Sequence, residues 1–474
     1  MTAAPLWTAR EAAAATGGRN SADWRCAGIV ADSRRVAPGD LFVALRGPRF
    51  DGHDYVARAL AEGAAAALVS RRPNDIADDA PLLVVDDVLA ALTRLAAAAR
   101  ARSAAQVVAV TGSVGKTGTK EALKLALGVQ APTHVSPASF NNHWGVPLAL
   151  AALPREARFA VFELGMNHAG EIGPLSRLVR PHVAVITTVE AVHTAYFPSL
   201  AAIADAKAEV FEGMDADGVL VGNKDNPFHA RLAAAARARG LRRVVCFGDH
   251  PHAGVRLTEC RLGTDDSQVE AEIEGRAIAY TVGAPGRHWV INSLAVLGAV
   301  AALGADLDRA AAALADLRAL PGRGARERVA LDDGGFVLID ESYNANPTST
   351  RAAIEVLGNT PPAPGGRRIA VLGDMLELGA DAAERHAGLA PALTRAGVDL
   401  VFTVGPNMAC LRAALPAGMR ACHAERATNI VAPVVAAVAA GDVVMVKGSL
   451  GTAMAPVVAA LRERAGAAAP RAAG

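Results

Sequence analysis

The sequence predicts an α/β fold divided into three domains. Short runs of β-branched residues alternate with helical stretches rich in Ala, Leu and Arg along almost the whole chain, which is the α/β pattern. A chain of 474 residues is long enough for about three domains of ordinary size. The Leu320–Gly324 segment, which contains Pro and two Gly, separates two such alternating series and is typical of a linker. We therefore expect domains at residues 1–86, 87–323 and 324–474.

The first block is expected to hold four short strands. Turn-forming pairs at Pro38-Gly39 and Asp51-Gly52 punctuate it. An Ala-rich helix at Val88–Arg102 then leads into the middle block. The expected strands are Ile29–Val30, Leu41–Leu45, Ala67–Val69 and Leu82–Val85. This pattern predicts a small α/β domain.

A Gly-rich loop between a strand and a helix marks the middle block. The apolar run Gln106–Thr111 ends at the loop, and Lys116 and Thr117 open an Ala- and Leu-rich helical stretch. Such a loop turns successive backbone N–H groups toward an anion, and the helix N-terminus adds its positive dipole end. Lys116 can then reach the β- and γ-phosphates, and the Thr117 hydroxyl can ligate Mg²⁺. The residues expected to bind the nucleotide here are Gly112, Ser113, Val114, Gly115, Lys116, Thr117 and Gly118.

The loop departs at one position from the full phosphate-loop pattern. Val110 stands where the first Gly of that pattern would be. The alternative reading is an ordinary Gly-containing turn between a strand and a helix. Because the strand precedes the loop and the helix follows it directly, we favour phosphate binding and predict that the chain binds a nucleoside triphosphate.

Further apolar runs predict the remaining sheets. In the middle block they are Phe159–Leu164, Val183–Val189, Val219–Gly222 and Val244–Phe247, and a helix at Ile291–Leu303 closes the block. In the third block they are Phe336–Ile339, Arg368–Leu372, Leu400–Val404 and Val443–Val446, each followed by a helical stretch. We expect a central P-loop ATPase-type domain with a parallel sheet and a C-terminal Rossmann-like, doubly wound domain.

Composition and charge exclude several classes of protein. Lys and Arg number 48 and Asp and Glu 47, so no global basic field points to nucleic acid or a membrane surface. The five Cys are scattered and never spaced C-x-x-C, which indicates reduced thiols rather than a disulfide framework or a zinc site. The N-terminus has no apolar signal region, and runs such as 432–440 are far shorter than the ~20 residues of a membrane span. We expect a soluble, intracellular protein.

Three side chains beyond the loop are candidates on position alone. Glu163 comes at the end of its strand, where ligands collect in open parallel sheets, and a carboxylate there suits Mg²⁺. The alternative for Glu163 is a solvated residue at a strand end. His193 follows the Val183–Val189 strand in the same way, although a lone His is more often structural. Lys207 lies in an apparent helix, where a solvated Lys is the default reading.

Short motifs occur in a fixed order along nearly the whole chain. They are Thr111–Thr117, Asn141–Pro147, Glu163–Asn167, Ala206–Glu209, Asp340–Pro347, Leu372–Gly379 and Val446–Ser449. In this order and spacing they resemble the Mur ligases of peptidoglycan synthesis. Within the family, the resemblance is to the members that join D-Ala-D-Ala to UDP-N-acetylmuramoyl-tripeptide. It rests on the Ser342–Pro347 segment and the Asn141-Asn142 pair.

The resemblance implies an activity and its partners. It implies an ATP-dependent ligase of peptidoglycan precursor synthesis that forms an amide through an acyl phosphate, releasing ADP and phosphate. Its substrates would be UDP-MurNAc-tripeptide, D-Ala-D-Ala and ATP, with Mg²⁺ as cofactor. We expect a cytoplasmic monomer with no nucleic-acid or membrane partner.

The resemblance also gives Lys207 a role that its spacing does not. The matching lysine in the family is carbamylated, which turns a cation into an anion that helps to hold a second Mg²⁺. Carbamylation requires the neutral amine, so the pKa of Lys207 must be lowered by burial or by nearby positive charge. Glu163, His193 and Lys207 are then expected metal ligands together with Thr117. The expected catalytic residues are Lys116, Lys207 and His193.

The resemblance carries over to further binding positions. Those expected to contact ATP are Asn292, Arg323, Asp340 and Tyr343, with Trp289 where relatives usually have another Asn. Those expected to bind the uridine nucleotide are Ser33, Arg34, Arg46 and Gly47 in the first block. The remaining substrate-binding positions are Asn141, Asn142, Asn344, Asn346, Lys447 and Ser449, the last four near D-Ala-D-Ala. Leu450 follows Ser449 where many relatives have Arg.

Two alternatives to this reading stay open. One is a sister ligase that adds a different amino acid, or adds glutamates to a folate, although the uridine-type first block argues against the folate enzyme. The other is a non-ligase P-loop ATPase or switch whose remaining blocks bind partners. In the ligase reading, the Leu320–Gly324 linker is expected to act as a hinge. We expect a free form in which Asp340 and Tyr343 lie well away from Lys116, and closure when ATP and the uridine nucleotide bind.

Overall fold

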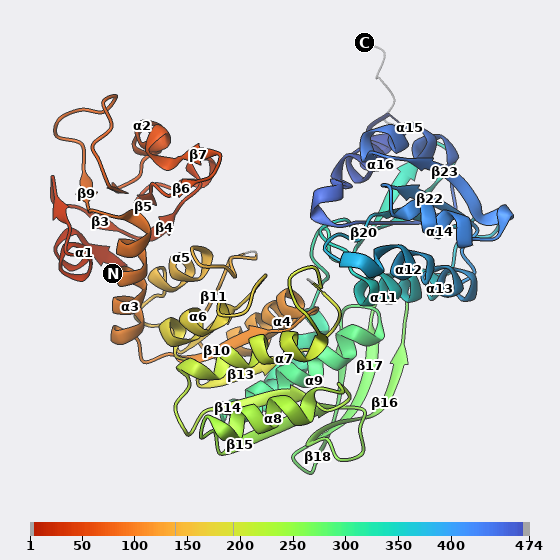
Figure 1. Ribbon diagram of the computed structural model, residues 1–474, viewed down its shortest axis with the longest axis horizontal. Helices are drawn as coiled ribbons and strands as arrows, with labels where there is room; N and C mark the ends of the chain where they lie inside the picture. The colour runs from red at the N-terminus through yellow and green to blue at the C-terminus, as the bar shows by residue number, and fades with distance from the viewer. Residues whose placement is uncertain (1–3, 138, 193, 468–474) are drawn as a thin grey trace.

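The first of three units is built on a five-stranded sheet (Figure 1). The computed structural model describes residues 4–137, 139–192 and 194–467. The sheet has the order β2-β9-β8-β5-β4, with β4 to β9 parallel and β2 antiparallel at the edge. Its strands are β2 (Arg19–Asn20), β4 (Gly28–Val30), β5 (Asp40–Val43), β8 (Ala66–Val69) and β9 (Leu82–Val84), and its helices are α1 (Ala9–Thr16) and α2 (Val56–Ala61). The strands predicted from apolar runs are therefore present.

Helix α3 (Val88–Arg102) joins the first unit to the second, with the bounds that the sequence predicts. Its apolar face, which includes Leu92, Leu95 and Ala99, packs on α1 on one side and on α5 (Gly145–Ala151) on the other. Trp7 Nε1 donates to the carbonyl of Ala151 at 2.9 Å across the same junction. One continuous core therefore covers both units, which fixes the first unit to the second.

The middle unit contains a nine-stranded sheet that carries the phosphate loop. Its order is β11-β12-β10-β13-β14-β15-β16-β17-β18, parallel from β11 to β16 and antiparallel from there on. The parallel strands are β11 (Thr133–Val135), β12 (Phe159–Glu163), β10 (Gln106–Thr111), β13 (Val183–Ile186), β14 (Val219–Asn223) and β15 (Arg243–Gly248). The helices are α4 (Lys116–Gly128), α6 (Ile172–Val179), α7 (Leu200–Ala208), α8 (His229–Ala238), α9 (Arg287–Ala302) and α10 (Leu307–Ala313).

The two faces of this sheet follow from alternation along its strands. In β10, Val108 and Val110 pack into the core formed with α4, α9 and α10, whereas Val107 and Ala109 face the core shared with α3, α5 and α6. Both faces are covered, so most of the parallel strands are predominantly apolar. This explains why apolar runs located β10, β12, β13, β14 and β15 in the sequence.

Several strands were not predicted, among them β2, β11 and β23 (Arg420–Ala424), the strands of the antiparallel extension of the middle sheet, and the edge strand of the third unit. The extension and the edge strand are β16 (Val255–Leu262), β17 (Ser267–Ile273), β18 (Arg276–Val282) and β19 (Ala325–Leu331). In β17 buried and exposed residues alternate, because only one face of this extension is covered. Such strands lack the continuous apolar runs by which the others were recognised.

The third unit is a six-stranded sheet of order β19-β20-β24-β21-β22-β23, parallel except for the antiparallel edge strand β19. Its other strands are β20 (Gly334–Glu341), β21 (Arg368–Gly373), β22 (Leu400–Val404), β23 (Arg420–Ala424) and β24 (Val443–Lys447). The helices are α11 (Pro347–Gly358), α12 (Ala382–Ala387), α13 (Ala390–Arg395), α14 (Met408–Ala414), α15 (Ala427–Ala437) and α16 (Ala455–Ala467). The predicted doubly wound, Rossmann-like third domain is confirmed, and so is the α/β fold class.

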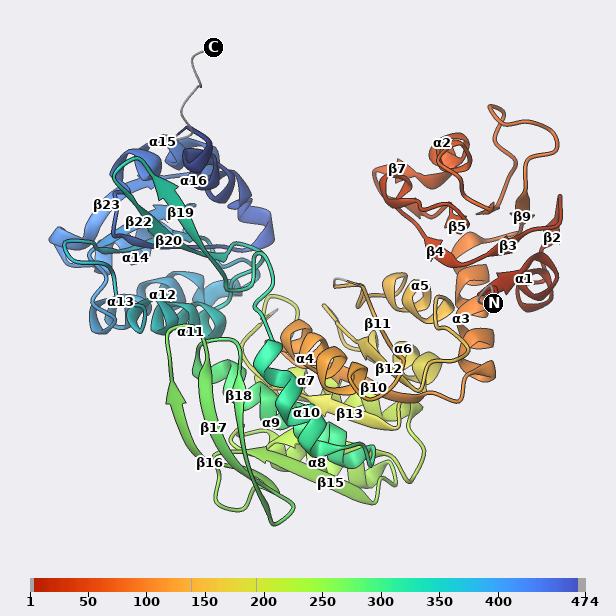
Figure 2. The same cartoon turned by 180° about the vertical axis from the view of Figure 1, so that it is seen from behind.

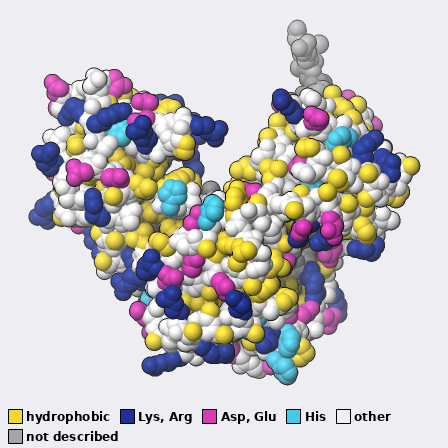
Figure 3. Space-filling model, in the orientation of Figure 1, with side chains coloured by type: hydrophobic (Ala, Val, Ile, Leu, Met, Phe, Trp, Pro, Cys, Tyr) yellow, Lys and Arg dark blue, Asp and Glu magenta, His cyan; other side chains and the backbone are white. Residues whose placement is uncertain are grey.

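The first and third units stand on either side of the middle one. The first and third units are separated in both ribbon views (Figures 1 and 2), and Figure 3 shows a wide notch between them. The linker enters the third unit through Gly322 (φ 74°) and Gly324 (φ 95°), both in the left-handed region that favours Gly. Among the described residues, no helix is long and apolar enough to span a bilayer.

Candidate active site

The loop between β10 and α4 has the backbone that phosphate binding requires. Gly115 has a φ of 86°, which residues with a Cβ rarely adopt. Gly112 lies so close to Thr187 that a Cβ would be 1.9 Å from the threonine Oγ1. Because α4 begins at Lys116, the unpaired N–H groups of its first turn and its positive dipole end face the loop.

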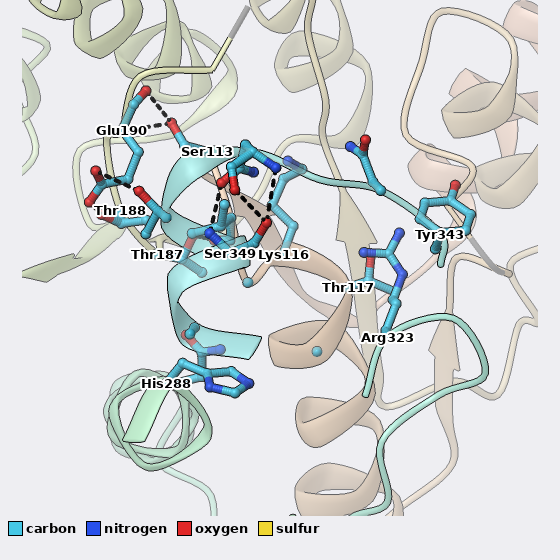
Figure 4. Close-up of a pocket in the computed structure, with 18 of the residues that line it drawn as sticks. Ser113, Lys116, Thr117, Thr187, Thr188, Glu190, His288, Arg323, Tyr343 and Ser349 are labelled. Carbon is cyan, nitrogen blue, oxygen red and sulfur yellow. Dashed lines mark hydrogen bonds between the residues drawn. The ribbon is translucent and has the colours of Figure 1, made fainter. Parts of the chain in front are cut away.

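The segment that follows β13 holds this loop in place. The N–H of Ser113 donates to the carbonyl of Thr188 at 2.9 Å, and the Thr187 hydroxyl donates to the carbonyl of Val114 at 2.6 Å. Figure 4 shows Ser113, Thr187 and Thr188 beside Lys116. Since β13 is the direct neighbour of β10, the sheet order itself brings the two segments together.

Glu163 lies beside the phosphate loop, as expected from its place at a strand end. Strand β12 pairs with β10, and Val110 is the register partner of Glu163. The Thr117 hydroxyl donates to Glu163 Oε2 at 2.9 Å, and Asn141 Nδ2 donates to Oε1 at 2.8 Å. The carboxylate is only 1% exposed and has no ion-pair partner among residues 4–137, 139–192 and 194–467. It is a buried anion held by two neutral donors.

Lys116 turns back over the loop that precedes it. Its Nζ donates to the carbonyl of Gly112 at 2.8 Å. Burial lowers the pKa of Lys116, the nearby Glu163 carboxylate works against this shift, and Arg323 adds to it. The side chain thus lies across the loop, where it can exchange the carbonyl for a phosphate oxygen.

Lys207 is a buried amine in α7 and not the solvated residue that its helix would suggest. Its side chain is 2% exposed, and it forms no hydrogen bond or ion pair within the described part of the chain. Burial lowers the pKa of Lys207 well below its ordinary value, and the charge of Lys116 lowers it further. This environment favours the neutral amine.

The metal site that the resemblance implies is described only in part. Thr117 and Glu163 are in contact, whereas His193 lies outside the described residues. No group of three or more His, Cys, Asp or Glu side chains in the described ranges could hold a metal by itself. A metal held at this point would therefore take further ligands from phosphates and water, as Mg²⁺ commonly does.

Residues of the linker and the third unit complete one cavity with the phosphate loop. The Tyr343 hydroxyl donates to Ser139 Oγ at 3.0 Å, and Arg323 donates to the same oxygen at 3.1 Å. The Arg323 guanidinium stacks 4.0 Å from the centre of the Tyr343 ring (Figure 4). The cavity has a volume of about 610 Å³. Because Lys116 and Tyr343 both line it, this structure is not the open arrangement expected from the linker.

Three of the residues expected near the dipeptide line the same cavity. Lys447 Nζ is 3.0 Å from Glu341 Oε2 and donates to the carbonyl of Asn344 at 3.1 Å. Asn346 caps α11 by accepting the N–H of Ser349 at 2.8 Å. Asn344, Asn346 and Lys447 all contribute to the lining.

Several other expected positions do not line it, among them Gly112 and Lys207 as well as Asp340, Ser449 and Asn142. The Asp340 carboxylate accepts from Arg462 at 3.2 Å, the Ser449 hydroxyl accepts the N–H of Leu376 at 2.9 Å, and Asn142 caps the first turn of α5 at 2.9 Å. The first bond joins two side chains of the third unit, and the other two hold backbone N–H groups. None of the three side chains belongs to the lining of the cavity.

Helix α9 lies directly against the phosphate loop. A Cβ at Gly115 would be 3.0 Å from the Asn292 side chain, and a Cβ at Gly118 would be 2.8 Å from the Trp289 ring. Asn292 therefore lies beside the loop, as the resemblance implies. Trp289 packs on Gly118, which makes this Gly a packing position.

The positions expected to bind the uridine nucleotide lie in the first unit and not in this cavity. Arg34 forms a two-pronged ion pair with Asp32, at 2.9 and 2.8 Å, and this pair lowers the pKa of Asp32 to about 2. The Arg34 side chain remains 78% exposed, so its outer face is free to meet a ligand. Ser33 is buried beside it, and Arg46 and Gly47 form the short strand β6.

Ser139, Glu190 and His288 line the cavity but were not predicted. Glu190 directly follows the predicted run Val183–Val189, so the strand-end reasoning that selected Glu163 would also have found it. Ser139 lies two positions before Asn141 but carries no signal of its own. Burial lowers the pKa of His288, which keeps this ring neutral.

Family models match all three units. The model described as "Mur ligase family, catalytic domain" matches residues 25–100, "Mur ligase middle domain" matches 110–300, and "Mur ligase, glutamate ligase domain" matches 326–450. These ranges follow the division into three sheets.

Individual relatives cover nearly the whole chain. The UDP-N-acetylmuramoyl-tripeptide–D-alanyl-D-alanine ligase of Escherichia coli is 37% identical over 92% of this chain and 93% of its own length. The corresponding protein of Rickettsia prowazekii is 31% identical over 96% and 99%. A crystal structure of MurF from Acinetobacter baumannii superposes with a TM-score of 0.82 at 31% identity, covering 98% of this chain and 100% of that one. MurF of Thermotoga maritima in complex with ADP gives a TM-score of 0.75 at 26% identity, over 93% and 98%.

Proposed function

The chain belongs to the Mur ligase family, and from this we propose that it joins D-alanyl-D-alanine to UDP-N-acetylmuramoyl-tripeptide with conversion of ATP to ADP and phosphate. The observation that carries the proposal is the connected set of Lys116, Thr117, Glu163 and Asn141 in a cavity completed by Tyr343. This set and residues of the third unit line one cavity at a domain junction, which supports a reaction between a nucleotide on the loop and a second bound reactant. A cytoplasmic location follows from the proposed use of ATP.

We propose that ATP binds with its phosphates on the loop at 112–118 and its base toward α9. The loop N–H groups and Lys116 would neutralise the phosphate charge, and Asn292, which lies beside Gly115 and lines the cavity, would contact the nucleoside. Arg323 from the linker and Tyr343 from the third unit line the same cavity and stack on each other. A relative solved with ADP supports nucleotide binding by this fold.

The residues beside the loop fit a Mg²⁺ ion. Glu163 is a buried carboxylate without a cationic partner in the described ranges, and burial of such a charge is unfavourable unless it is compensated. The oxygens of Glu163 and Thr117 are ligands of the kind that Mg²⁺ prefers. Bound there, Mg²⁺ would reduce the repulsion between a substrate carboxylate and the triphosphate.

Lys207 is proposed as the site of carbamylation. Its lowered pKa favours the neutral amine that CO₂ requires, and the contribution of the Lys116 charge to this lowered pKa supports a position near the phosphate loop. A carbamate there would bring a second buried anion toward the metal side of the loop. His193 stays a proposed metal ligand.

We propose that each unit brings one reactant, with domains at 1–86, 87–323 and 324–474. Arg34 and its neighbours would hold the uridine nucleotide, and Asn344, Asn346 and Lys447 would hold D-Ala-D-Ala. The tripeptide would then extend from the first unit across the notch in Figure 3 to the cavity.

The chemistry follows from the poor leaving ability of a carboxylate oxygen. The terminal carboxylate of the tripeptide attacks the γ-phosphorus of ATP and displaces ADP, which gives an acyl phosphate. The free amine of D-Ala-D-Ala then attacks the carbonyl carbon, and the tetrahedral intermediate expels phosphate to leave the amide. Lys116 offsets the charge that gathers on the transferring group. Enclosure by the third unit excludes water, which would hydrolyse the acyl phosphate.

Phosphate release tests the proposal. The protein is incubated with ATP and Mg²⁺, with UDP-MurNAc-tripeptide alone, with D-Ala-D-Ala alone, and with both, and the product is identified by mass. We expect sustained release only with both substrates and a product that carries the added dipeptide. Sustained hydrolysis without either substrate would instead identify a P-loop ATPase or switch. Turnover only with another amino acid would identify a sister ligase.

A further inference from the structure

Glu190 contacts the phosphate loop through its backbone. Its N–H donates to Ser113 Oγ at 2.9 Å, and the Ser113 hydroxyl donates to the carbonyl of Glu190 at 3.1 Å. Figure 4 shows Glu190 beside Ser113, with dashed lines marking the hydrogen bonds between them. The conformation of the loop at Ser113 is therefore tied to the position of Glu190.

The side chain of the same residue reaches the third unit. Glu190 Oε2 accepts from the Thr348 hydroxyl at 3.2 Å, and Oε1 accepts from the Thr188 hydroxyl at 3.1 Å. Thr348 is in the first turn of α11, next to Asn346 and Ser349, which also line the cavity. One half-buried residue thus contacts both the phosphate loop and the helix of the third unit that closes over it.

The negative charge of Glu190 lies beside the site proposed for the triphosphate. A carboxylate beside a triphosphate site repels the ligand, so it would weaken nucleotide binding if its charge were its only contribution. Two hydroxyl donors hold the carboxylate in place instead. A structural benefit of these bonds must therefore outweigh the repulsion if Glu190 supports binding.

We infer that Glu190 is a positioning residue that couples the docking of α11 to the shape of the phosphate loop, so that ATP binds tightly only when the third unit is docked. The inference rests on the ATP site of the proposed function. It assigns to Glu190 no contact with the reacting atoms. The coupling runs from Thr348 through the carboxylate and backbone of Glu190 to Ser113.

The affinity for a non-hydrolysable ATP analogue with Mg²⁺, measured by titration calorimetry, tests this coupling. Glu190→Ala should bind the analogue about tenfold more weakly, because hydrogen bonds to a charged group are lost. Thr348→Val, which is nearly isosteric but has no hydroxyl, should also bind the analogue more weakly than the unaltered protein. Thr348→Ser keeps the hydroxyl and should bind the analogue as tightly as the unaltered protein. The double variant Glu190→Ala/Thr348→Val should bind like Glu190→Ala alone, because both changes break one connection.

A matched control separates coupling from docking in general. Arg326 also joins the third unit to the middle one, through the carbonyl of Thr264 in the β16–β17 turn, but away from the phosphate loop. Arg326→Met should leave the affinity for the analogue unchanged. An equal loss of affinity in Arg326→Met would show that docking alone matters and would overturn the inference.

The remaining outcomes are also decisive. Tighter binding by Glu190→Ala would mean that the residue acts only as a repulsive charge, and full additivity in the double variant would mean that the two residues act separately. Either result overturns the coupling while the ATP site stands. Failure of the unaltered protein to bind the analogue would instead reject the proposed function. If Glu190→Ala is too unstable for its affinity to be measured, the affinities of Thr348→Val and Thr348→Ser for the analogue are compared instead. Equal affinities of these two variants would overturn the inference.

Discussion

Replacing Lys207 with Met should inactivate the protein and should also make the nucleotide-free protein more stable near neutral pH. The amine is 2% exposed, has no partner within the described residues and has a pKa well below its ordinary value of 10.5. A buried amine of this kind penalises the folded state, because the unfolded chain can keep the proton that the folded chain cannot. Met fills a similar volume without that penalty.

The size of the effect follows from linkage. Each unit by which the folded-state pKa falls below the unfolded value costs about 1.4 kcal/mol at a pH below both values. A gain of 1 kcal/mol raises the melting temperature by roughly 2–4 °C for a folding unit of 150–250 residues. The penalty is largest below the folded-state pKa of Lys207 and disappears as the pH rises toward 10.5. The advantage of Lys207→Met should therefore narrow steadily with rising pH.

Calorimetric melting at several pH values, in buffer freed of CO₂, measures this difference. Lys120→Met is the matched control, since Lys120 is also fully buried but donates to the carbonyl of Ser136 at 2.7 Å and lies 3.0 Å from Glu121. Loss of that partnered charge should destabilise the protein by roughly 3–5 kcal/mol. Bicarbonate should stabilise the unaltered protein but not Lys207→Met. If Lys207→Met melted lower than the unaltered protein at neutral pH, the assignment of Lys207 as an unpaired buried amine would be wrong.

Three further substitutions test other parts of the site. Lys116→Ala should lower kcat by about 10²–10³ without loss of the circular-dichroism signal, and a parallel loss of that signal would make Lys116 structural. Glu163→Gln should raise the Mg²⁺ concentration needed for half-maximal activity at least roughly tenfold, because the amide still accepts a hydrogen bond but carries no charge; an unchanged Mg²⁺ titration would remove Glu163 from the metal site. Arg34→Ala should raise KM for the uridine nucleotide about tenfold and leave KM for ATP unchanged, and equal effects on both would contradict separate binding sites.

The sequence predicted the position of a residue in the fold where a short local pattern around that residue indicated it. Thr117 follows a loop of recognisable pattern, and Glu163 ends an apolar strand. Because neighbouring parallel strands place their carboxyl ends at one edge, these two local signals were enough to bring the side chains together. The burial of Lys207 had no such signal, since the helix around it is rich in small apolar residues on all sides.

The contacts that close the cavity could not be predicted for a different reason. Ser139 meets Arg323 and Tyr343 across 184 and 204 residues of sequence, and Glu190 meets Thr348 across 158. The hydrophobic periodicity of the sequence does not indicate such hydrogen-bonded pairs, because the pairs depend on how two separate sheets dock. The linker pattern predicted mobility, whereas these hydrogen bonds hold the third unit against the second.

Transfer of oxygen from substrate to phosphate tests the central claim most directly. UDP-MurNAc-tripeptide labelled with ¹⁸O in both oxygens of its terminal carboxylate is turned over with ATP and D-Ala-D-Ala, and the released phosphate is analysed by mass spectrometry. If the carboxylate attacks the γ-phosphorus, one labelled oxygen leaves with each phosphate and the other stays in the amide carbonyl. Phosphate that carries no label from the substrate, while the amide product still forms, would contradict activation through an acyl phosphate.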